Sequence, residues 1–239
     1  MKYTVYIYSI SVPMNKLIDL LTHRHLVWQG NREQPAFATI TSGFDTLDHA
    51  LAGGFPAQGV MELESAIGIG ELRLLLPSLA KQVRLVVFIN PPAEVHAHAL
   101  LHAGISLERV LIIRPKSHTE ALWAAEWCAK SAACVSVLLW HGDIEIHQVK
   151  RLQMAAQSGE SQVWLLRHAI VTRCALPWTL SLSLQPAEQG LMVQVNKCKG
   201  GRPSRSFYVN FNSHWQDLTV PIAHQAEIVP FESLQQLAQ

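Results

Sequence analysis

The sequence predicts an α/β fold in which a mostly parallel central sheet is extended by antiparallel strands toward the C-terminus. Between residues 60 and 167, short apolar runs of strand length alternate with helical stretches, which is the pattern of right-handed βαβ units. After residue 175, polar and apolar residues alternate as in antiparallel strands joined by turns. With 239 residues, 49% of them hydrophobic, the chain can bury a sizeable core without disulfides or a metal.

Each element of this fold has a local signal. The apolar runs interpreted as parallel strands cover residues 60–64, 85–90, 110–114, 135–140 and 162–167. The expected helices between them cover residues 71–82, 92–103, 117–131 and 143–157. Ser117 and Glu120 form a capping-box pattern, and we expect Asp143 to cap the last of these helices. The expected antiparallel strands cover residues 180–185, 191–196 and 206–211.

Composition excludes several classes of protein. Only 15% of the residues are charged, against roughly 25% in average soluble domains, and the net charge is +1, so a disordered chain and a uniformly basic nucleic-acid coat are excluded. No apolar run approaches the roughly 18–20 residues that cross a bilayer, so no membrane partner is expected. The cysteines lack a CxxC pattern, which predicts reduced thiols in a cytoplasmic protein. They are Cys128, Cys134, Cys174 and Cys198.

Charge is segregated along the chain, and this helps to divide it. Residues 161–211 carry a net charge of +5, whereas residues 212–239 carry −3 and no Lys or Arg. We therefore expect a core over residues 41–211, preceded by a helical segment over residues 14–40 and followed by an acidic tail. In this tail Phe231, Leu234 and Leu237 have helical spacing, which suits docking on a partner or on the core.

Residues 41–64 resemble the stretch that precedes the ATP-binding loop of RecA. The resemblance rests on Thr41-Ser-Gly-Phe-Asp-Thr-Leu-Asp48, on Gly53-Gly54-x-Pro56 and on Gly59. A phosphate-binding loop of the form GxxxxGK[ST] is expected to follow, but the sequence reads Ser65-Ala-Ile-Gly-Ile-Gly-Glu-Leu72.

Each replacement in this loop removes part of its chemistry. Ser65 replaces the first glycine, Glu71 places a negative charge where the lysine would face the phosphates, and Leu72 cannot bind magnesium. Gly68 and Gly70 still permit a tight turn from strand to helix. We therefore expect the turn to form without its phosphate chemistry.

The acidic positions of a RecA-type ATPase are replaced as well. The strand at residues 85–90 ends in Asn90, followed two residues later by Pro92, where RecA relatives carry the carboxylate that activates water. The strand at residues 135–140 ends in Trp140 instead of a magnesium-associated aspartate. Phosphoryl transfer loses its electrostatic stabilisation without these groups. We therefore expect a degenerate ATPase site, with no catalytic residue and no cofactor.

A closer resemblance is to the ImuA family of RecA-like proteins. It is carried by residues 25–30, 68–77, 90–92, 121–126, 151–156 and 165–167. The wider resemblance to RecA covers roughly residues 41–211 and implies a RecA-like three-layer sandwich. The ImuA resemblance implies an SOS-induced, non-catalytic scaffold of translesion DNA synthesis. Its implied partners are ImuB, which is an inactive polymerase relative, an error-prone polymerase, and RecA.

Two other functions stay open. Residues 84–140 also resemble SulA, the SOS inhibitor of cell division, which would make FtsZ the partner. The remaining alternative is an atypical RecA-type ATPase.

The basic hairpin of residues 197–205 has two interpretations. It is either a solvated turn or a contact for DNA or a partner, because RecA relatives use such regions near DNA or at subunit contacts. The candidate contacts are Lys197, Lys199, Arg202 and Arg205.

Residues 1–13 form a strand-like run before a second methionine, Met14. One interpretation is an edge strand. The other is that translation starts at Met14, so that residues 1–13 are a non-native extension translated from regulatory DNA. Residues 4–9 allow codons that spell CTG, an alternating run of T and A, and CAG, which resembles the operator of the SOS repressor LexA. The codons of the gene decide between the two.

Two further clusters have structural interpretations. His96, His98 and His102 lack a metal-ligand spacing and have no cysteine or carboxylate pattern beside them, so no metal site is expected. Trp123 and Trp127 lie four residues apart on an expected helix, and we interpret them as core packing.

Overall fold

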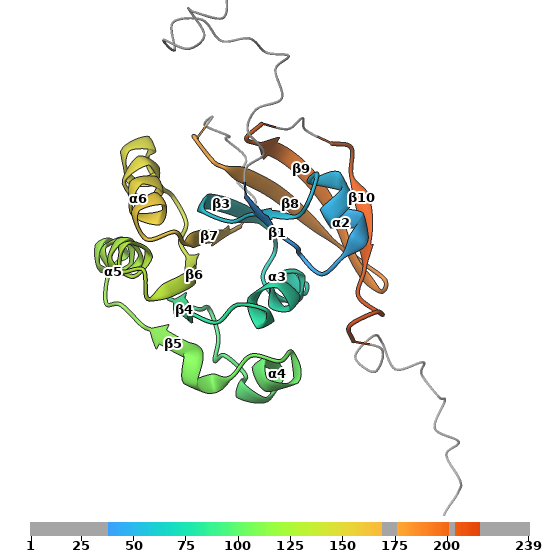
Figure 1. The fold of residues 1–239 in the computed structure, drawn as a ribbon, viewed down its shortest axis with the longest axis horizontal. Helices are drawn as coiled ribbons and strands as arrows, with labels where there is room; N and C mark the ends of the chain where they lie inside the picture. Colours follow the sequence, from blue (N-terminus) through green and yellow to red (C-terminus); the bar gives the residue numbers. More distant parts are fainter. Residues whose placement is uncertain (1–37, 169–175, 201–203, 216–239) are drawn as a thin grey trace, which may run out of the picture. The chain divides into compact units, whose positions relative to one another are not determined.

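The protein is described here from a computed structural model, which describes residues 38–168, 176–200 and 204–215 (Figure 1). The expectations for residues 1–37, for most of the acidic tail, and for Cys174 and Arg202 lie outside these residues.

The core is an eight-stranded sheet in the order β10-β9-β8-β3-β7-β6-β4-β5. Five strands at one side are parallel: β3 (Gly59–Glu64), β4 (Leu85–Ile89), β5 (Val110–Ile113), β6 (Cys134–Trp140) and β7 (Gln162–Arg167). The other three are β8 (Leu180–Ala187), β9 (Gly190–Cys198) and β10 (Phe207–Asn210). The expected α/β fold with antiparallel C-terminal strands is confirmed, with one refinement: β8 pairs parallel with β3 and antiparallel with β9.

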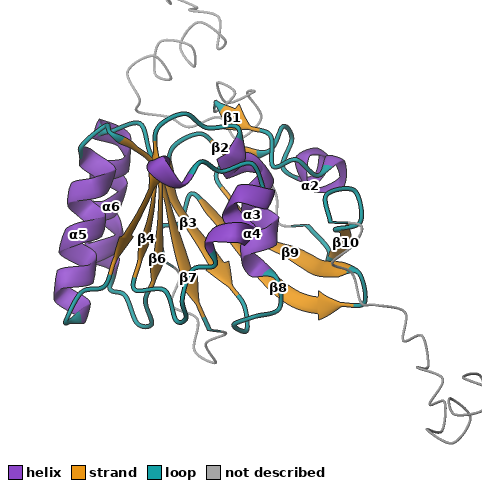
Figure 2. Ribbon diagram, turned by 90° about the horizontal axis from the view of Figure 1, so that it is seen from below, coloured by secondary structure: helices purple, strands orange, loops and turns teal. Residues whose placement is uncertain are grey.

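Helices cover both faces of this sheet, which gives three layers (Figure 2). On one face lie α5 (His118–Lys130) and α6 (Ile146–Ser158), with Val137, Leu139 and Leu165 beneath them. The opposite face carries α2 (Asp45–Ala50), α3 (Glu71–Ala80), α4 (Ala97–His102) and the 3-10 turn Leu107–Arg109. A two-stranded sheet, β1 (Thr39–Ile40) with β2 (Phe55–Pro56), places Phe55 edge-on to Trp164 in the core. The sequence had not indicated α2, β1 or β2.

Two helices begin later than the sequence predicted. The segment from Pro92 to His96 is not helical, and α4 starts at Ala97. The expectation that Asp143 caps the helix after β6 is wrong. Glu145 caps α6 instead, in a reciprocal capping box with Gln148.

The interpretation of Trp123 and Trp127 as core residues is also wrong. Their side chains are 60% and 58% exposed, because Ala121, Ala125 and Ala129 form the face of α5 that lies against the sheet. Small side chains let the helix approach the strands closely, so the bulky stripe on the opposite face is left in solvent.

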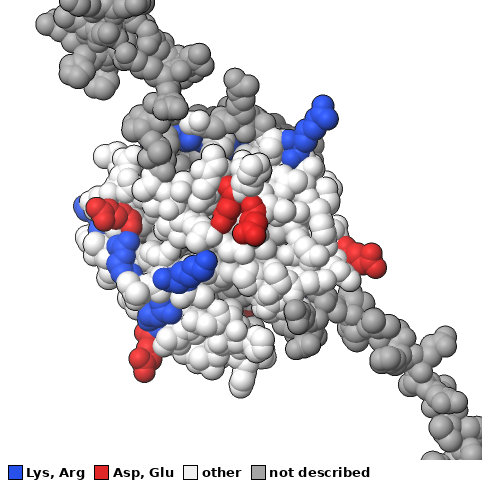
Figure 3. Space-filling view, turned by 45° about the vertical axis from the view of Figure 1, so that its right-hand side comes forward, with Lys and Arg blue, Asp and Glu red and all other residues white. Residues whose placement is uncertain are grey.

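The surface of the described residues carries few charged side chains, as the low charged fraction of the sequence predicts (Figure 3). Figure 3 shows a face on which charged side chains are sparse and most of the area is uncharged. Among the described residues, no helix combines the length and apolarity needed to span a membrane. Within the part of the chain that the structure describes, Cys128 and Cys134 form no disulfide.

Candidate functional site

The loop between β3 and α3 keeps the shape of an anion-binding turn. Gly68 and Gly70 have φ values of +84° and +102°, which side-chain-bearing residues rarely adopt. A Cβ atom on Gly70 would also lie 3.2 Å from the ring of Phe211. The expectation that these glycines make a tight turn therefore agrees with the backbone geometry.

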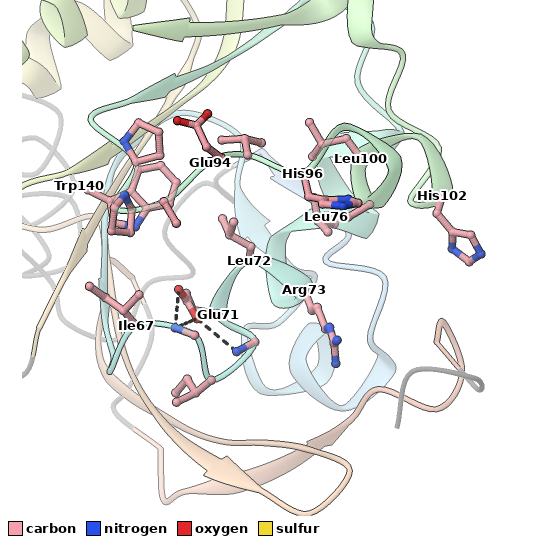
Figure 4. Close-up of a pocket in the computed structure, with 18 of the residues that line it drawn as sticks. Ile67, Glu71, Leu72, Arg73, Leu76, Glu94, His96, Leu100, His102 and Trp140 are labelled. Atoms are coloured by element: carbon pink, nitrogen blue, oxygen red, sulfur yellow. Dashed lines mark hydrogen bonds between the residues drawn. The ribbon is translucent and has the colours of Figure 1, made fainter. Parts of the chain in front are cut away.

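The carboxylate of Glu71 fills the concave side of this turn. The backbone N–H of Gly68 donates to both carboxylate oxygens, at 3.2 and 3.1 Å, and the N–H of Gly70 donates to Oε2 at 3.2 Å (Figure 4). Glu71 is only 7% exposed and is the first residue of α3. Converging backbone N–H groups at a helix start form a site for anions, and here an anion of the chain itself occupies it.

The other replaced positions meet at the carboxyl ends of the parallel strands. The side-chain amide of Asn90 donates to the carbonyl oxygen of Trp140 at 3.3 Å, because β4 and β6 are neighbours in the sheet. Asn90, Pro92 and Trp140 also line one cavity together with Ser65 and Glu71. The structure thus brings these sequence-predicted positions together, although none of them except Glu71 carries a carboxylate.

A larger, mostly apolar cavity of about 460 Å³ opens beside the loop (Figure 4). Leu72 lines it, so the position of the expected magnesium-binding hydroxyl presents a hydrocarbon side chain. The other apolar walls come from the loop itself, α3, α4, the end of β6 and the last described residue. They include Ile67, Leu76, Leu100, Trp140 and Trp215.

The basic hairpin lies at the other end of the sheet. Lys199 bonds through its backbone to Thr179, just before β8, whereas the loop follows the end of the parallel strand β3. The ammonium of Lys197 donates to the carbonyl of Leu176 at 3.0 Å, and Arg205 is exposed. The structure therefore separates these candidate contacts from the loop.

The sequence did not indicate a group of polar residues around the cavity that Asn90, Pro92 and Trp140 line, which has a volume of about 350 Å³. His141 follows β6 directly, is 8% exposed, and has no hydrogen-bond partner for either ring nitrogen among the described residues. The pKa of His141 is lowered, chiefly by burial. Arg167 ends β7 and also lines this cavity. The signal that could have found these residues is their position at strand ends.

No three metal-ligating side chains gather within the part of the chain that the structure describes. His96 and His98 lie with their ring centroids 5.7 Å apart at the start of α4.

Comparison with known proteins agrees with part of the sequence-based expectation. No known family profile matches the sequence. The chain is 27% identical to RecA from Picosynechococcus sp. over 57% of its own length and 39% of that protein. It is 30% identical to RecA from Oceanobacillus iheyensis over 57% of its own length and 40% of that protein. This similarity and the α/β sheet support a RecA-like fold.

The RecA similarity has a limited extent. The chain spans about two fifths of the length of the RecA relatives it matches. A crystal structure of SulA from Pseudomonas aeruginosa is also similar, with 28% sequence identity, a TM-score of 0.40, and coverage of 46% of this chain and 98% of SulA. The resemblance to ImuA in particular stays a prediction.

Proposed function

We propose that this chain is a non-catalytic, RecA-like accessory protein of SOS-induced translesion DNA synthesis. It would scaffold a complex of an ImuB-type polymerase relative, an error-prone polymerase and RecA. Its RecA-like core would offer binding surfaces to these partners without hydrolysing ATP. The similarity to RecA supports the link to DNA damage, and the observation that carries the non-catalytic part is the Glu71 carboxylate inside the loop.

The carboxylate opposes nucleotide binding in two ways. It uses the N–H groups of Gly68 and Gly70 that would otherwise face a phosphate. It also places a negative charge beside any phosphate that approaches, and two like charges about 4 Å apart repel by roughly 1 kcal/mol in water and about 4 kcal/mol near a protein surface. The residues present therefore do not fit magnesium and ATP.

Replacement of the carboxylate tests this argument directly. Glu71→Ala should lower the free energy of unfolding by about 1 kcal/mol, because the backbone N–H groups of Gly68 and Gly70 lose their acceptor. Pyrophosphate should then raise the unfolding temperature of the variant but not that of the unaltered chain. Glu94→Ala is the control. It removes an exposed carboxylate that lines the cavity of about 460 Å³, as Glu71 does, and should show neither effect.

The same measurement with magnesium and ATP decides the enzymatic alternative. The unaltered chain should show no stabilisation and no release of phosphate. Stabilisation by ATP that is lost on adding EDTA would contradict the proposal and favour an atypical RecA-type ATPase.

Deletion of the gene tests the translesion part of the proposal. Loss of damage-induced mutagenesis, with growth of undamaged cells unchanged, is the expected result. A gene for a polymerase relative immediately downstream would support it further.

A second candidate function is a SulA-like inhibitor of cell division that binds FtsZ. The resemblance of residues 84–140 to SulA favours it. Overexpression in undamaged cells distinguishes the two functions, because an inhibitor should produce filaments and a translesion scaffold should not.

A further inference from the structure

The outward face of α5 carries a stripe that the proposed function does not use. Glu120, Trp123, Trp127 and Lys130 follow each other at intervals of three, four and three residues, so they share one face of the helix. The two tryptophans are 60% and 58% exposed, and their ring centroids lie 5.9 Å apart. Two adjacent exposed tryptophans are unusual on a monomer and typical of the centre of a protein interface.

We propose that this stripe binds a second copy of the chain, with the two α5 helices antiparallel across a twofold axis. Such an axis passes between Trp123 and Trp127, so that each tryptophan faces the other tryptophan of the second copy. A contact of this kind is self-complementary, as a twofold interface requires. It would remove from water the bulky apolar side chains that the fold leaves exposed.

The charges of Glu120 and Lys130 favour a second copy of the chain in the antiparallel direction. The same axis places Glu120 opposite the partner's Lys130, and Lys130 opposite the partner's Glu120, which gives two attractive pairs beside the tryptophans. A parallel arrangement would place Glu120 opposite the partner's Glu120 and Lys130 opposite the partner's Lys130, and both pairs repel. The order of charges along the stripe therefore fits an antiparallel pair.

The neighbouring helix extends the surface. A small hollow of about 140 Å³ lies between α5 and α6, and Trp123, Leu122 and Leu152 are among its walls. Met154 on α6 is 71% exposed. Since α5 and α6 together form one outer layer of the sandwich, the second copy would rest on both helices (Figure 1).

Sedimentation equilibrium of the full chain over a range of concentrations tests the dimer. Trp123→Ala and Trp127→Ala should each weaken association by at least about 30-fold, the size of a hot-spot loss. The unfolding temperature at a concentration where all variants are monomeric should stay unchanged. Leu101→Ala alters an exposed apolar residue on α4, at the opposite face of the sheet, and should leave association intact.

Charge reversal tests the antiparallel arrangement. Glu120→Lys alone and Lys130→Glu alone should each weaken association, because each creates two like-charge pairs. An equal mixture of the two variants should associate again, since one copy then carries two lysines and the other two glutamates. Glu120→Lys also removes a hydrogen bond from the backbone N–H of Lys116, but a loss of helix stability would not be reversed by mixing.

Three results would overturn the inference. These are a chain that is monomeric at every concentration, association that is indifferent to both tryptophans, and single charge variants that associate as strongly as the unaltered chain.

Discussion

Asn90 shows how single residues hold this end of the sheet together. Its backbone has a left-handed φ of +55°, and its amide bonds to the carbonyl of Trp140. The ring of Trp140 in turn stacks on Phe88 in the core. Positions where RecA relatives are expected to carry carboxylates thus make structural contacts with one another. Their chemistry could be predicted from the sequence, but their mutual contact depends on the neighbouring positions of β4 and β6.

His141 allows a prediction of pH dependence at the same scale. Its pKa in the folded chain is lowered, chiefly by burial, below the value of about 6.5 expected when unfolded. The unfolded state therefore binds more protons as the pH falls below about 6.5, and the folded state loses stability. His141→Phe should remove this loss, which denaturant unfolding between pH 7.5 and pH 5 would measure.

An exposed histidine supplies the control for this measurement. His98→Phe, on α4, should leave the pH dependence of the free energy of unfolding unchanged. Equal slopes for His141→Phe and the unaltered chain would contradict the prediction.

At the scale of one element, α5 shows why the sequence alone could not identify the buried face. Its alanines at positions 121, 125 and 129 and its tryptophans both follow helical spacing, so either stripe could face the core. The larger hydrocarbon area favoured the tryptophans. In the structure the alanines face the sheet, and their small side chains let the helix lie close to it. The start of α5, by contrast, was predictable from local residues, since Ser117 and Glu120 supply the cap.

The cap of α5 gives a prediction for this element. The hydroxyl of Ser117 accepts a hydrogen bond from the backbone N–H of Glu120 at 3.2 Å. Ser117→Ala should lower the free energy of unfolding by about 1 kcal/mol, because a backbone donor in the first turn loses its acceptor. Thr119→Ala, an exposed change in the same turn, should have a much smaller effect in the same denaturation experiment. Equal losses in both variants would argue against the cap.

At the scale of the whole molecule, buried polar bonds join the parallel and antiparallel parts of the sheet. Ser181 on β8 donates to Glu62 on β3 at 2.5 Å, and Arg167 on β7 lies 3.5 Å from the same carboxylate. Ser183 donates to Glu64 at 3.1 Å. These contacts link residues more than a hundred positions apart in the chain, so no local sequence pattern indicates them.

Removing both members of the Glu62–Arg167 ion pair should cost less stability than the two single changes added together. The Arg167 guanidinium is nearly buried, and Glu62→Leu removes the carboxylate beside it. This should lower the free energy of unfolding by about 3–5 kcal/mol. Glu62→Leu combined with Arg167→Leu should lose less than the sum of the single changes. Urea unfolding of the two single variants and the double variant measures the difference. Glu188→Ala, at an exposed position, is the control, and strictly additive losses would contradict the prediction.

The sequence by itself determined the order of strands and helices between residues 59 and 167, the tight turn at Gly68 and Gly70, and the glutamate in place of a lysine in the loop. These features depend on residue type and on spacing within one element. Only the tertiary structure showed that the Glu71 carboxylate occupies the turn, that the basic hairpin lies at the other end of the sheet, and that the tryptophans of α5 face solvent. Each of these depends on distances between elements, which local periodicity does not encode.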